Sequence, residues 1–247
     1  MPWGTTFRAS DGTLFMLTYS IPLTTIKILP EFTSKKIGVH NIDIISVIVG
    51  NLLGESHGEK RGPGTRFHIH MSSKNVEYLM FLHKFYSIRK YTSINKPFLS
   101  KKIGKHNKIY FSYKFRTYTY SSFNFLYDMF YDQNKKKIIP FNIQKYLTPL
   151  TLAVWIMNTR LADENQSART KLGKGLRIWL CNFNNTDIIR LKKAIKKVFG
   201  FKTLKLYKSK GKNLTYNIYF PEKEMFLLSS IVKPYFVESM YYKLNGF

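Results

Sequence analysis

The residues best suited to chemistry lie at the end of an apolar run at positions 48–56 and just after it. Glu55 stands near the end of this run, and His57, His68 and His70 follow it. A carboxylate followed by three imidazoles could suggest a metal site. His68 and His70, however, are two residues apart in an extended-looking segment, so they point to one face of a strand. The histidines therefore fit a strand surface better than a metal site.

A second run at positions 152–160 resembles the first and begins 104 residues after position 48. Internal similarity of this kind predicts two copies of one structural unit. The copies differ at their ends, because Thr159 occupies the place that Glu55 holds in the first run, and Arg160 follows it. The second copy therefore replaces a carboxylate by a hydroxyl and adds a cation.

The charge balance predicts a polyanionic partner. The chain of 247 residues carries 40 Lys and Arg against 14 Asp and Glu, a formal net charge of +26. That much charge of one sign repels itself in a compact fold, whereas binding phosphates neutralises it and releases counterions. We therefore expect a nucleic acid rather than a membrane surface. The longest apolar runs, 44–53 and 147–157, are shorter than the ~20 residues of a spanning helix.

Cysteine usage and the amino terminus bear on the compartment. The single Cys181 excludes a disulfide framework, and no His or Cys spacing resembles a closed zinc site. Residues 1–32 lack the pattern of a secretory signal. Lys, Asn, Ile, Tyr and Phe are abundant, as in the product of an AT-rich gene. These features favour a reducing compartment and an organelle genome.

Hydrophobic periodicity predicts the same order of elements in each copy: helix, strands, helix, strands, helix. In the first copy, Ser72 and Ser73 cap a helix with apolar positions at Val76, Leu79, Met80 and Leu82. In the second, Asn185 or Thr186 caps a helix that Gly200 ends, and Pro234 ends the last helix. The elements expected after each run are strands 65–70 and 108–118 and helix 121–131, then strand 175–181, helix 186–199, strands 204–208 and 214–220, and helix 222–232.

The resulting fold class is α+β, with three parts along the chain. We expect an extension at 1–37, a first unit at 38–137 and a second unit at 138–247. Residues 132–146 are polar and interrupted by Pro140, so they are predicted to form the linker. The extension is predicted either to pack on the first unit or to thread along a nucleic acid or protein partner.

Several segments together resemble a known family. They are the two runs and residues 53–61, 120–124, 136–140, 146–157 and 232–235. Over residues 38–245 the chain resembles the LAGLIDADG homing endonucleases, in particular the two-motif, single-chain members encoded in organelle introns. The resemblance implies two pseudo-symmetric αββαββα units that form a saddle, with the two motif helices packed at the centre and the core a monomer.

In that family, small residues four apart let the motif helices approach closely. Here Gly50 and Gly54 supply that face in the first helix, whereas Val154 and Asn158 occupy the matching places in the second. These side chains are larger, so we expect a looser or repacked helix contact.

The resemblance also implies metal-assisted cleavage of phosphodiesters by an acid at the end of each motif helix. Glu55 keeps a carboxylate in the first motif, and the candidates for it are a residual single-metal site or a solvated or paired acid. Thr159 removes the acid from the second motif, and Arg160 adds a charge that repels metal ions. Nearby Asp163 and Glu164 are possible substitutes. We expect no functional catalytic residue and no cofactor, with Mg²⁺ only if nuclease activity remains.

The family's saddle predicts which cations contact nucleic acid. Arg160 is a candidate for docking a phosphate at the former cutting site. The helix at 186–199 adds a basic surface away from the saddle, through Arg190, Lys193 and Lys197 with Lys192 and Lys196 beside them. The candidates on the sheets are Arg66, His68, His70, Lys105, Lys108, Lys114 and Arg116 in the first unit, and Lys171, Lys174, Arg177, Lys205, Lys208, Lys210 and Lys212 in the second.

Basic charge on several sides favours structured RNA over DNA. Our leading hypothesis is a nuclease-inactive mitochondrial protein that binds RNA, either as an intron maturase or as an rRNA-bound ribosomal component with ribosomal proteins as partners. The alternatives are a homing endonuclease that cuts or nicks DNA with a divalent metal, and a DNA-binding repressor.

Overall fold

The structure is a computed structural model, and it describes residues 5–8, 14–17, 40–104, 107–159, 175–180, 182–208, 216–244 and 246–247. The chain divides into two compact units, Met1–Lys36 and Ile37–Phe247. In the first unit, strands β1 (Thr5–Arg8) and β2 (Leu14–Leu17) pair antiparallel. The predicted halves 38–137 and 138–247 both lie within the second unit, which is described from here on.

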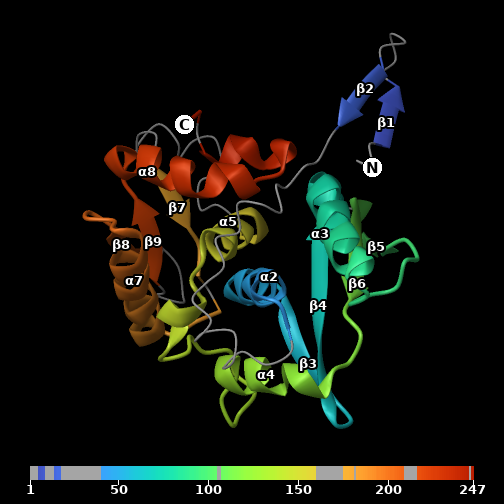
Figure 1. The fold of residues 1–247 in the computed structure, drawn as a ribbon, viewed down its shortest axis with the longest axis horizontal. Coiled ribbons are helices and arrows are strands. Elements are labelled where there is room, and N and C mark those ends of the chain that lie inside the picture. The colour runs from blue at the N-terminus through green and yellow to red at the C-terminus, as the bar shows by residue number, and fades with distance from the viewer. Residues whose placement is uncertain are drawn as a thin grey trace. The chain divides into compact units, whose positions relative to one another are not determined.

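Two buried helices form the centre of this unit (Figure 1). They are α2 (Ile42–Leu53) and α5 (Pro149–Asn158), and they pack directly against each other. Nearly every residue of both helices is buried, as their unbroken apolar sequences require. The start of α5 is well defined, because Thr148 accepts a hydrogen bond from the Thr151 amide and Pro149 occupies the first turn.

A four-stranded antiparallel sheet follows α2 in the order β3-β4-β6-β5. Helices α3 and α4 pack against this sheet in the first half of the unit. Ser121–Phe123 forms a 3-10 turn that leads into α4. The elements are β3 (His57–Arg61), β4 (Gly64–Ser72), α3 (Val76–Ile88), β5 (Phe98–Ile103), β6 (Ile109–Arg116) and α4 (Asn124–Phe130).

The second half repeats this plan around a three-stranded antiparallel sheet in the order β7-β9-β8. Helix α7 ends at Gly200, which adopts a positive φ of 77° as a left-handed helix cap. Short 3-10 segments, Lys233–Tyr235 and Glu238–Leu244, bring the chain back to α5. The elements are β7 (Leu176–Ile178), α7 (Asn185–Phe199), β8 (Lys205–Lys208), β9 (Tyr216–Phe220) and α8 (Glu222–Val232).

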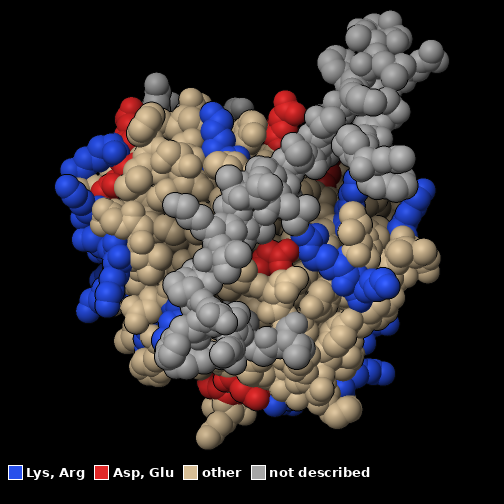
Figure 2. Space-filling view, in the orientation of Figure 1, with Lys and Arg blue, Asp and Glu red and all other residues tan. Residues whose placement is uncertain are grey.

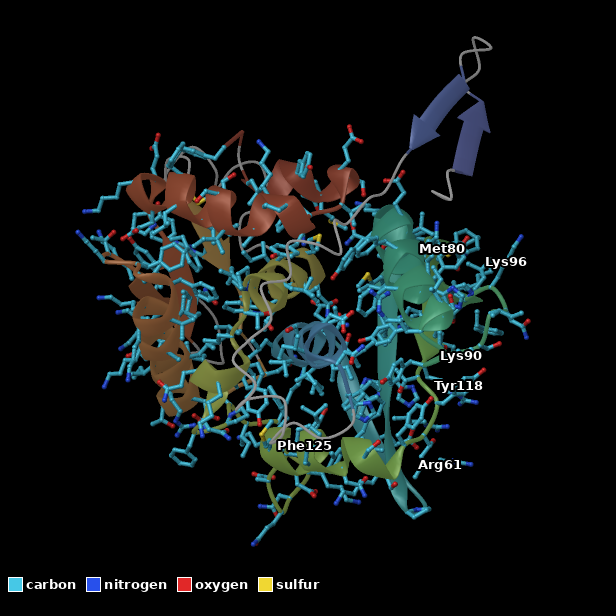
Figure 3. The ribbon with its side chains drawn as sticks, in the orientation of Figure 1. Arg61, Met80, Lys90, Lys96, Tyr118 and Phe125 are labelled. Carbon is cyan, nitrogen blue, oxygen red and sulfur yellow. The ribbon has the colours of Figure 1, made fainter. Side chains whose placement is uncertain are left out.

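The α+β class and the repeated order of elements are therefore confirmed, and several local predictions need correction. Asn184, not Asn185 or Thr186, caps α7 by accepting from the Asp187 amide. Met80, predicted as apolar core on α3, is 37% exposed and points outward (Figure 3). The predicted closing helix 121–131 is a 3-10 turn followed by the shorter α4.

The segment predicted as a polar linker is in fact partly core. Ile139, Ile143 and Tyr146 are buried in the same cluster as the motif helices, and Ile143–Tyr146 forms a 3-10 turn. An isolated bridge between Tyr131 and Lys137 fixes the start of the segment. The connection between the halves is thus a packed element, because burying its apolar side chains outweighs the local polarity that suggested a linker.

Candidate nucleic-acid interface

The contact between α2 and α5 is close because small residues on one helix face larger residues on the other. A Cβ added at Gly50 would lie 2.7 Å from the Thr151 carbonyl oxygen and 2.8 Å from the Val154 Cβ. At Gly54 it would lie 2.9 Å from the Asn158 amide nitrogen. The helices are therefore repacked rather than looser, with Val154 and Asn158 filling the space that the glycines leave.

Asn158 also links the two helices through polar groups. Its side-chain amide donates to the Asn51 carbonyl at 3.2 Å, to the Asn51 Oδ1 at 3.0 Å and to the Ser56 Oγ at 3.1 Å. Asn51 and Ser56 are buried, so these groups need partners within the protein. Asn158, which stands where the family has a small residue, thus has a structural role at the helix interface.

The end of α2 combines a carboxylate with an ammonium group. Glu55 is exposed beyond the last turn of the helix. The Lys137 Nζ donates to the Gly54 carbonyl at 3.1 Å and to the Ser56 carbonyl at 2.7 Å. A cation at the carboxyl end of a helix complements the helix dipole and satisfies carbonyls that have no partner within the helix.

The end of α5 has the ammonium group without the carboxylate. Thr159 is buried, and its hydroxyl donates to the Trp155 carbonyl at 2.7 Å. The Lys243 side chain is 1% exposed, and its Nζ donates to the carbonyls of Ile156 at 3.1 Å, Met157 at 2.7 Å and Thr159 at 2.8 Å. All three ammonium protons therefore have an acceptor.

Over the residues that the structure describes, the end of α5 offers a divalent ion no carboxylate. Among the described residues, no group of three or more His, Cys, Asp or Glu side chains is placed to hold a metal ion. Thr159 offers no negative charge, and the Lys243 ammonium already occupies the carbonyls beside it. A divalent ion at this helix end would meet a cation in place of the missing carboxylate.

The first sheet presents one open face lined with basic and aromatic side chains. Strand register sets His68 opposite Arg116 and His70 opposite Lys114, so these side chains share a face with Arg66. The intervening residues Phe67, Ile69 and Met71 are buried on the other face. Five predicted contact residues are thus brought together: Arg66, His68, His70, Lys114 and Arg116.

Glu59 on β3 holds part of this face in place. Its Oε2 accepts from the Arg66 side chain and from the His68 ring, each at 2.7 Å. These hydrogen bonds, mainly that from Arg66, lower the pKa of Glu59. His57 stacks on His68 with ring centroids 4.8 Å apart. Burial, followed by the charges of His68 and Lys137, lowers the pKa of His57.

Lys108 extends the open face beyond the start of β6. Lys108 is exposed, and its Nζ lies 5.7 Å from the centre of the Tyr110 ring. Tyr110 and Lys114 are four residues apart on β6, so their side chains lie on the same face of the sheet. At the edge strand, the Phe98 ring lies 4.8 Å from the Lys114 Nζ. This end of the sheet offers aromatic rings and cations together, a combination suited to contact with bases and phosphates.

The second sheet contributes fewer of the predicted residues to its open face. Arg177 and Lys205 both pair with Tyr219 in the strand register and therefore share a face. The Arg177 guanidinium lies 4.7 Å from the centre of the Tyr207 ring. Lys208 is exposed at the end of β8, but strand alternation places it on the other face from Lys205, together with Leu206, which packs against the core.

Helix α7 carries a separate basic surface. Lys193 and Lys197 are exposed there, and Figure 2 shows lysine and arginine side chains gathered along this side of the protein. Arg190 has partners within the chain, since its Nη1 donates to the Ile139 carbonyl at 2.6 Å and to Asp187 at 2.7 Å. Its guanidinium also lies 3.9 Å from the centre of the Phe141 ring. Arg190 therefore ties α7 to the connecting segment.

Several sequence candidates fall outside the residues that the structure describes. They are Lys105, Arg160, Asp163, Glu164, Lys171, Lys174, Cys181, Lys210 and Lys212. Three residues of the site were missed by sequence reasoning: Glu59, Lys137 and Lys243. Glu59 and Lys137 lie within segments 53–61 and 136–140, so the similarity of these segments to the family was the available signal for them.

The fold, the two adjacent motif helices and the paired sheets define the two-motif, single-chain class of LAGLIDADG proteins. The profile of the LAGLIDADG DNA endonuclease family matches residues 45–228. The chain belongs to this family. In the described residues, no helix is long and apolar enough to cross a membrane.

Two curated relatives are similar over most of the chain. The cytochrome b mRNA maturase bI2 of Saccharomyces cerevisiae is 35% identical over 88% of this chain and 52% of its own length. The protein of the same name from Debaryomyces hansenii is 34% identical over 83% of this chain and 74% of its own length. The chain thus spans about half of the first relative and about three quarters of the second.

A solved structure shares the fold. The homing endonuclease I-WcaI bound to its DNA recognition sequence aligns with a TM-score of 0.70 at 21% identity, covering 89% of this chain and 95% of that one. This likeness confirms the arrangement of helices and sheets.

Proposed function

We propose that this chain acts as an intron maturase, binding structured RNA without cutting DNA. The observation that carries the proposal is the end of α5. There Thr159 replaces an acid, and the Lys243 ammonium donates hydrogen bonds to the adjoining carbonyls. Loss of the acid removes an ionic metal ligand, while the scaffold and the basic open face remain. The names of the two mRNA maturases support the same activity.

The distribution of charge supports RNA as the partner. A DNA duplex seated on the saddle needs the open faces of the sheets, whereas a folded RNA contacts a protein from several directions. The lysines of α7 and the cations of the first sheet lie on different elements. Each phosphate that they neutralise contributes to affinity and to its salt dependence.

We also propose a mitochondrial location, which the same relatives support because they are named for cytochrome b mRNA. An rRNA-bound role in the mitochondrial ribosome would use the same basic surfaces. Co-sedimentation separates the two roles: a maturase fractionates with unspliced intron RNA, whereas a ribosomal component stays with ribosomes after that RNA is digested.

A DNA endonuclease is the second candidate, because the Glu55 carboxylate remains exposed at the end of α2. A single acid with Mg²⁺ could support nicking of one strand. The third candidate, a DNA-binding repressor, requires sequence-specific duplex binding that persists at high salt.

A cleavage assay decides between these functions. The wild type and Glu55→Gln are incubated with duplex DNA spanning the intron insertion site in Mg²⁺ or Mn²⁺, and their binding to the intron RNA is measured in parallel. We expect intact DNA with both proteins and equal RNA affinity. Nicking that depends on Glu55 would overturn the proposal in favour of the endonuclease.

A further inference from the structure

A pocket opens at the free edge of strand β3, beside the open face of the first sheet. Its volume is about 690 Å³, within the range of pockets that hold small ligands. It lies between β3, helix α4 and the turn that leads to Lys137, and its lining includes His57, Glu59, Tyr127 and Asp128.

The pocket joins the nucleic-acid face because β3 contributes to both. Glu59 lies on the open face, where it binds Arg66 and His68, and it also lines the pocket. His57 stacks on His68 and lines the pocket as well. The open face and the pocket are therefore continuous through the side chains of His57 and Glu59.

Two tyrosines build the aromatic wall. The rings of Tyr127 and Tyr131 stack with centroids 4.4 Å apart and an interplanar angle of 14°. The Tyr131 hydroxyl accepts from the Gly58 amide at 2.8 Å, and burial raises the pKa of Tyr131 to about 12. Because the hydrogen bond anchors Tyr131 to β3, the stacked pair forms a fixed surface rather than two mobile side chains.

Polar groups surround this wall. The Lys60 Nζ lies 2.6 Å from the Asp128 Oδ1 and 5.3 Å from the centre of the Tyr127 ring. Both side chains of this ion pair are at least half exposed, at 50% and 59%, so the pair is weak and easily displaced. A carboxylate and the nearby Gln133 can hydrogen-bond the edge of a base, and an ammonium can bind a phosphate.

We propose that this pocket receives an unpaired nucleotide that is turned out of a folded RNA. Aromatic stacking with polar groups at the base edge is how proteins recognise bases in loops and bulges. A perfectly paired duplex keeps its bases stacked inside, so the pocket discriminates bulged RNA from regular helices. This inference rests on the proposed RNA-binding function and adds the kind of RNA that is recognised.

The test uses two RNA hairpins of identical stem sequence, one fully paired and one carrying a bulged 2-aminopurine. Affinities are measured by competition at one salt concentration, and 2-aminopurine fluorescence reports stacking directly. We expect the bulged hairpin to bind about tenfold more tightly, consistent with stacking of one base. Its fluorescence should fall on binding.

Two variants probe the pocket and one serves as a control. Tyr127→Leu removes the ring but keeps apolar volume, and Asp128→Ala changes a side chain that is 59% exposed and therefore tolerates substitution. Both should lose the preference for the bulge while binding the paired hairpin as the wild type does. Tyr118→Leu alters an exposed tyrosine on the outer flank (Figure 3) and should retain the preference.

Each outcome has one meaning. If the wild type binds both hairpins with equal affinity, the proposal that the pocket binds the bulged base is wrong, although the protein still binds RNA. The same conclusion follows if Asp128→Ala loses affinity equally for both hairpins. A preference for the bulge that survives in both pocket variants also overturns it. If the wild type binds neither of the hairpins nor the intron RNA, the proposed function itself is contradicted.

Discussion

The ends of the two motif helices show how one architecture has diverged within a single chain. Both ends hold a lysine ammonium against helix carbonyls, Lys137 at α2 and Lys243 at α5. Within the part of the chain that the structure describes, the first end has a carboxylate, Glu55, and the second does not. Lys243 is fully buried, whereas Lys137 is half-buried. The second end is therefore a buried helix terminus, whereas the first faces solvent.

The largest expected effect comes from removing the enclosed lysine. Lys243→Met leaves three buried carbonyls without their donor, and we expect a loss of about 3 kcal/mol in the free energy of unfolding. Lys137→Met, at a half-buried position, should lose about 1 kcal/mol. Urea unfolding of both variants measures the difference. Equal losses would break the distinction between the two helix ends.

The helix contact gives the next largest effect. Gly50→Ala places a methyl group against backbone at Thr151 as well as Val154, so we expect a loss of about 2 to 3 kcal/mol. Gly54→Ala meets the Asn158 side chain, which can turn, and should lose about 1 kcal/mol. Thermal unfolding of the pair tests this order. A reversed order would show that the contact is tightest at the helix ends instead.

The two basic surfaces differ in a way that RNA affinity can measure. Lys114→Glu changes a cation on the open face near Phe98, and we expect a loss of about tenfold in affinity for intron RNA, with a smaller salt slope. Lys193→Glu on α7 should also lose affinity for RNA. If Lys114→Glu also lowers the affinity for duplex DNA and Lys193→Glu does not, the open face binds both nucleic acids and the α7 surface binds RNA only. Unchanged RNA affinity in Lys193→Glu would remove α7 from the interface.

The smallest effect concerns the starts of the motif helices. His40, just before α2, bonds the Tyr91 hydroxyl and the Ser122 hydroxyl, each at 2.8 Å, whereas Thr148 caps α5 without a titrating group. Burial lowers the pKa of His40 below 6.5, so the unfolded chain takes up its proton first as pH falls. Stability should therefore drop by about 1 kcal/mol between pH 7.5 and 5.5.

A matched pair of variants isolates that contribution. His40→Gln should flatten this part of the pH dependence, and Gln133→Ala, at an exposed position without an ionisable group, should leave it unchanged. Unfolding curves at the two pH values provide the measurement. An unchanged pH dependence in His40→Gln would assign the loss to other groups.

The sequence predicted the regular parts of the fold well because their signals are local. Helix α8 was predicted at 222–232 and lies there, since its apolar spacing and the flanking prolines mark both ends. Strands β3 and β5 were missed, because these edge strands are short and largely exposed and carry Lys60 and Lys101 rather than alternating apolar residues.

The site was less predictable because its central contacts join distant parts of the chain. Lys137 is 83 residues from Gly54, and Lys243 is 84 residues from Thr159. No periodicity or spacing within one element predicts such contacts. The open-face residues of β4 were predictable, since strand alternation alone places Arg66, His68 and His70 together.

The splicing of its intron RNA tests the proposed maturase function most directly. Precursor RNA is incubated alone, with the wild type and with Glu55→Gln, and the rate of exon joining is measured at a low Mg²⁺ concentration. We expect equal acceleration by both proteins, because RNA binding requires no cutting acid. No acceleration by the wild type, or acceleration that Glu55→Gln abolishes, would contradict it.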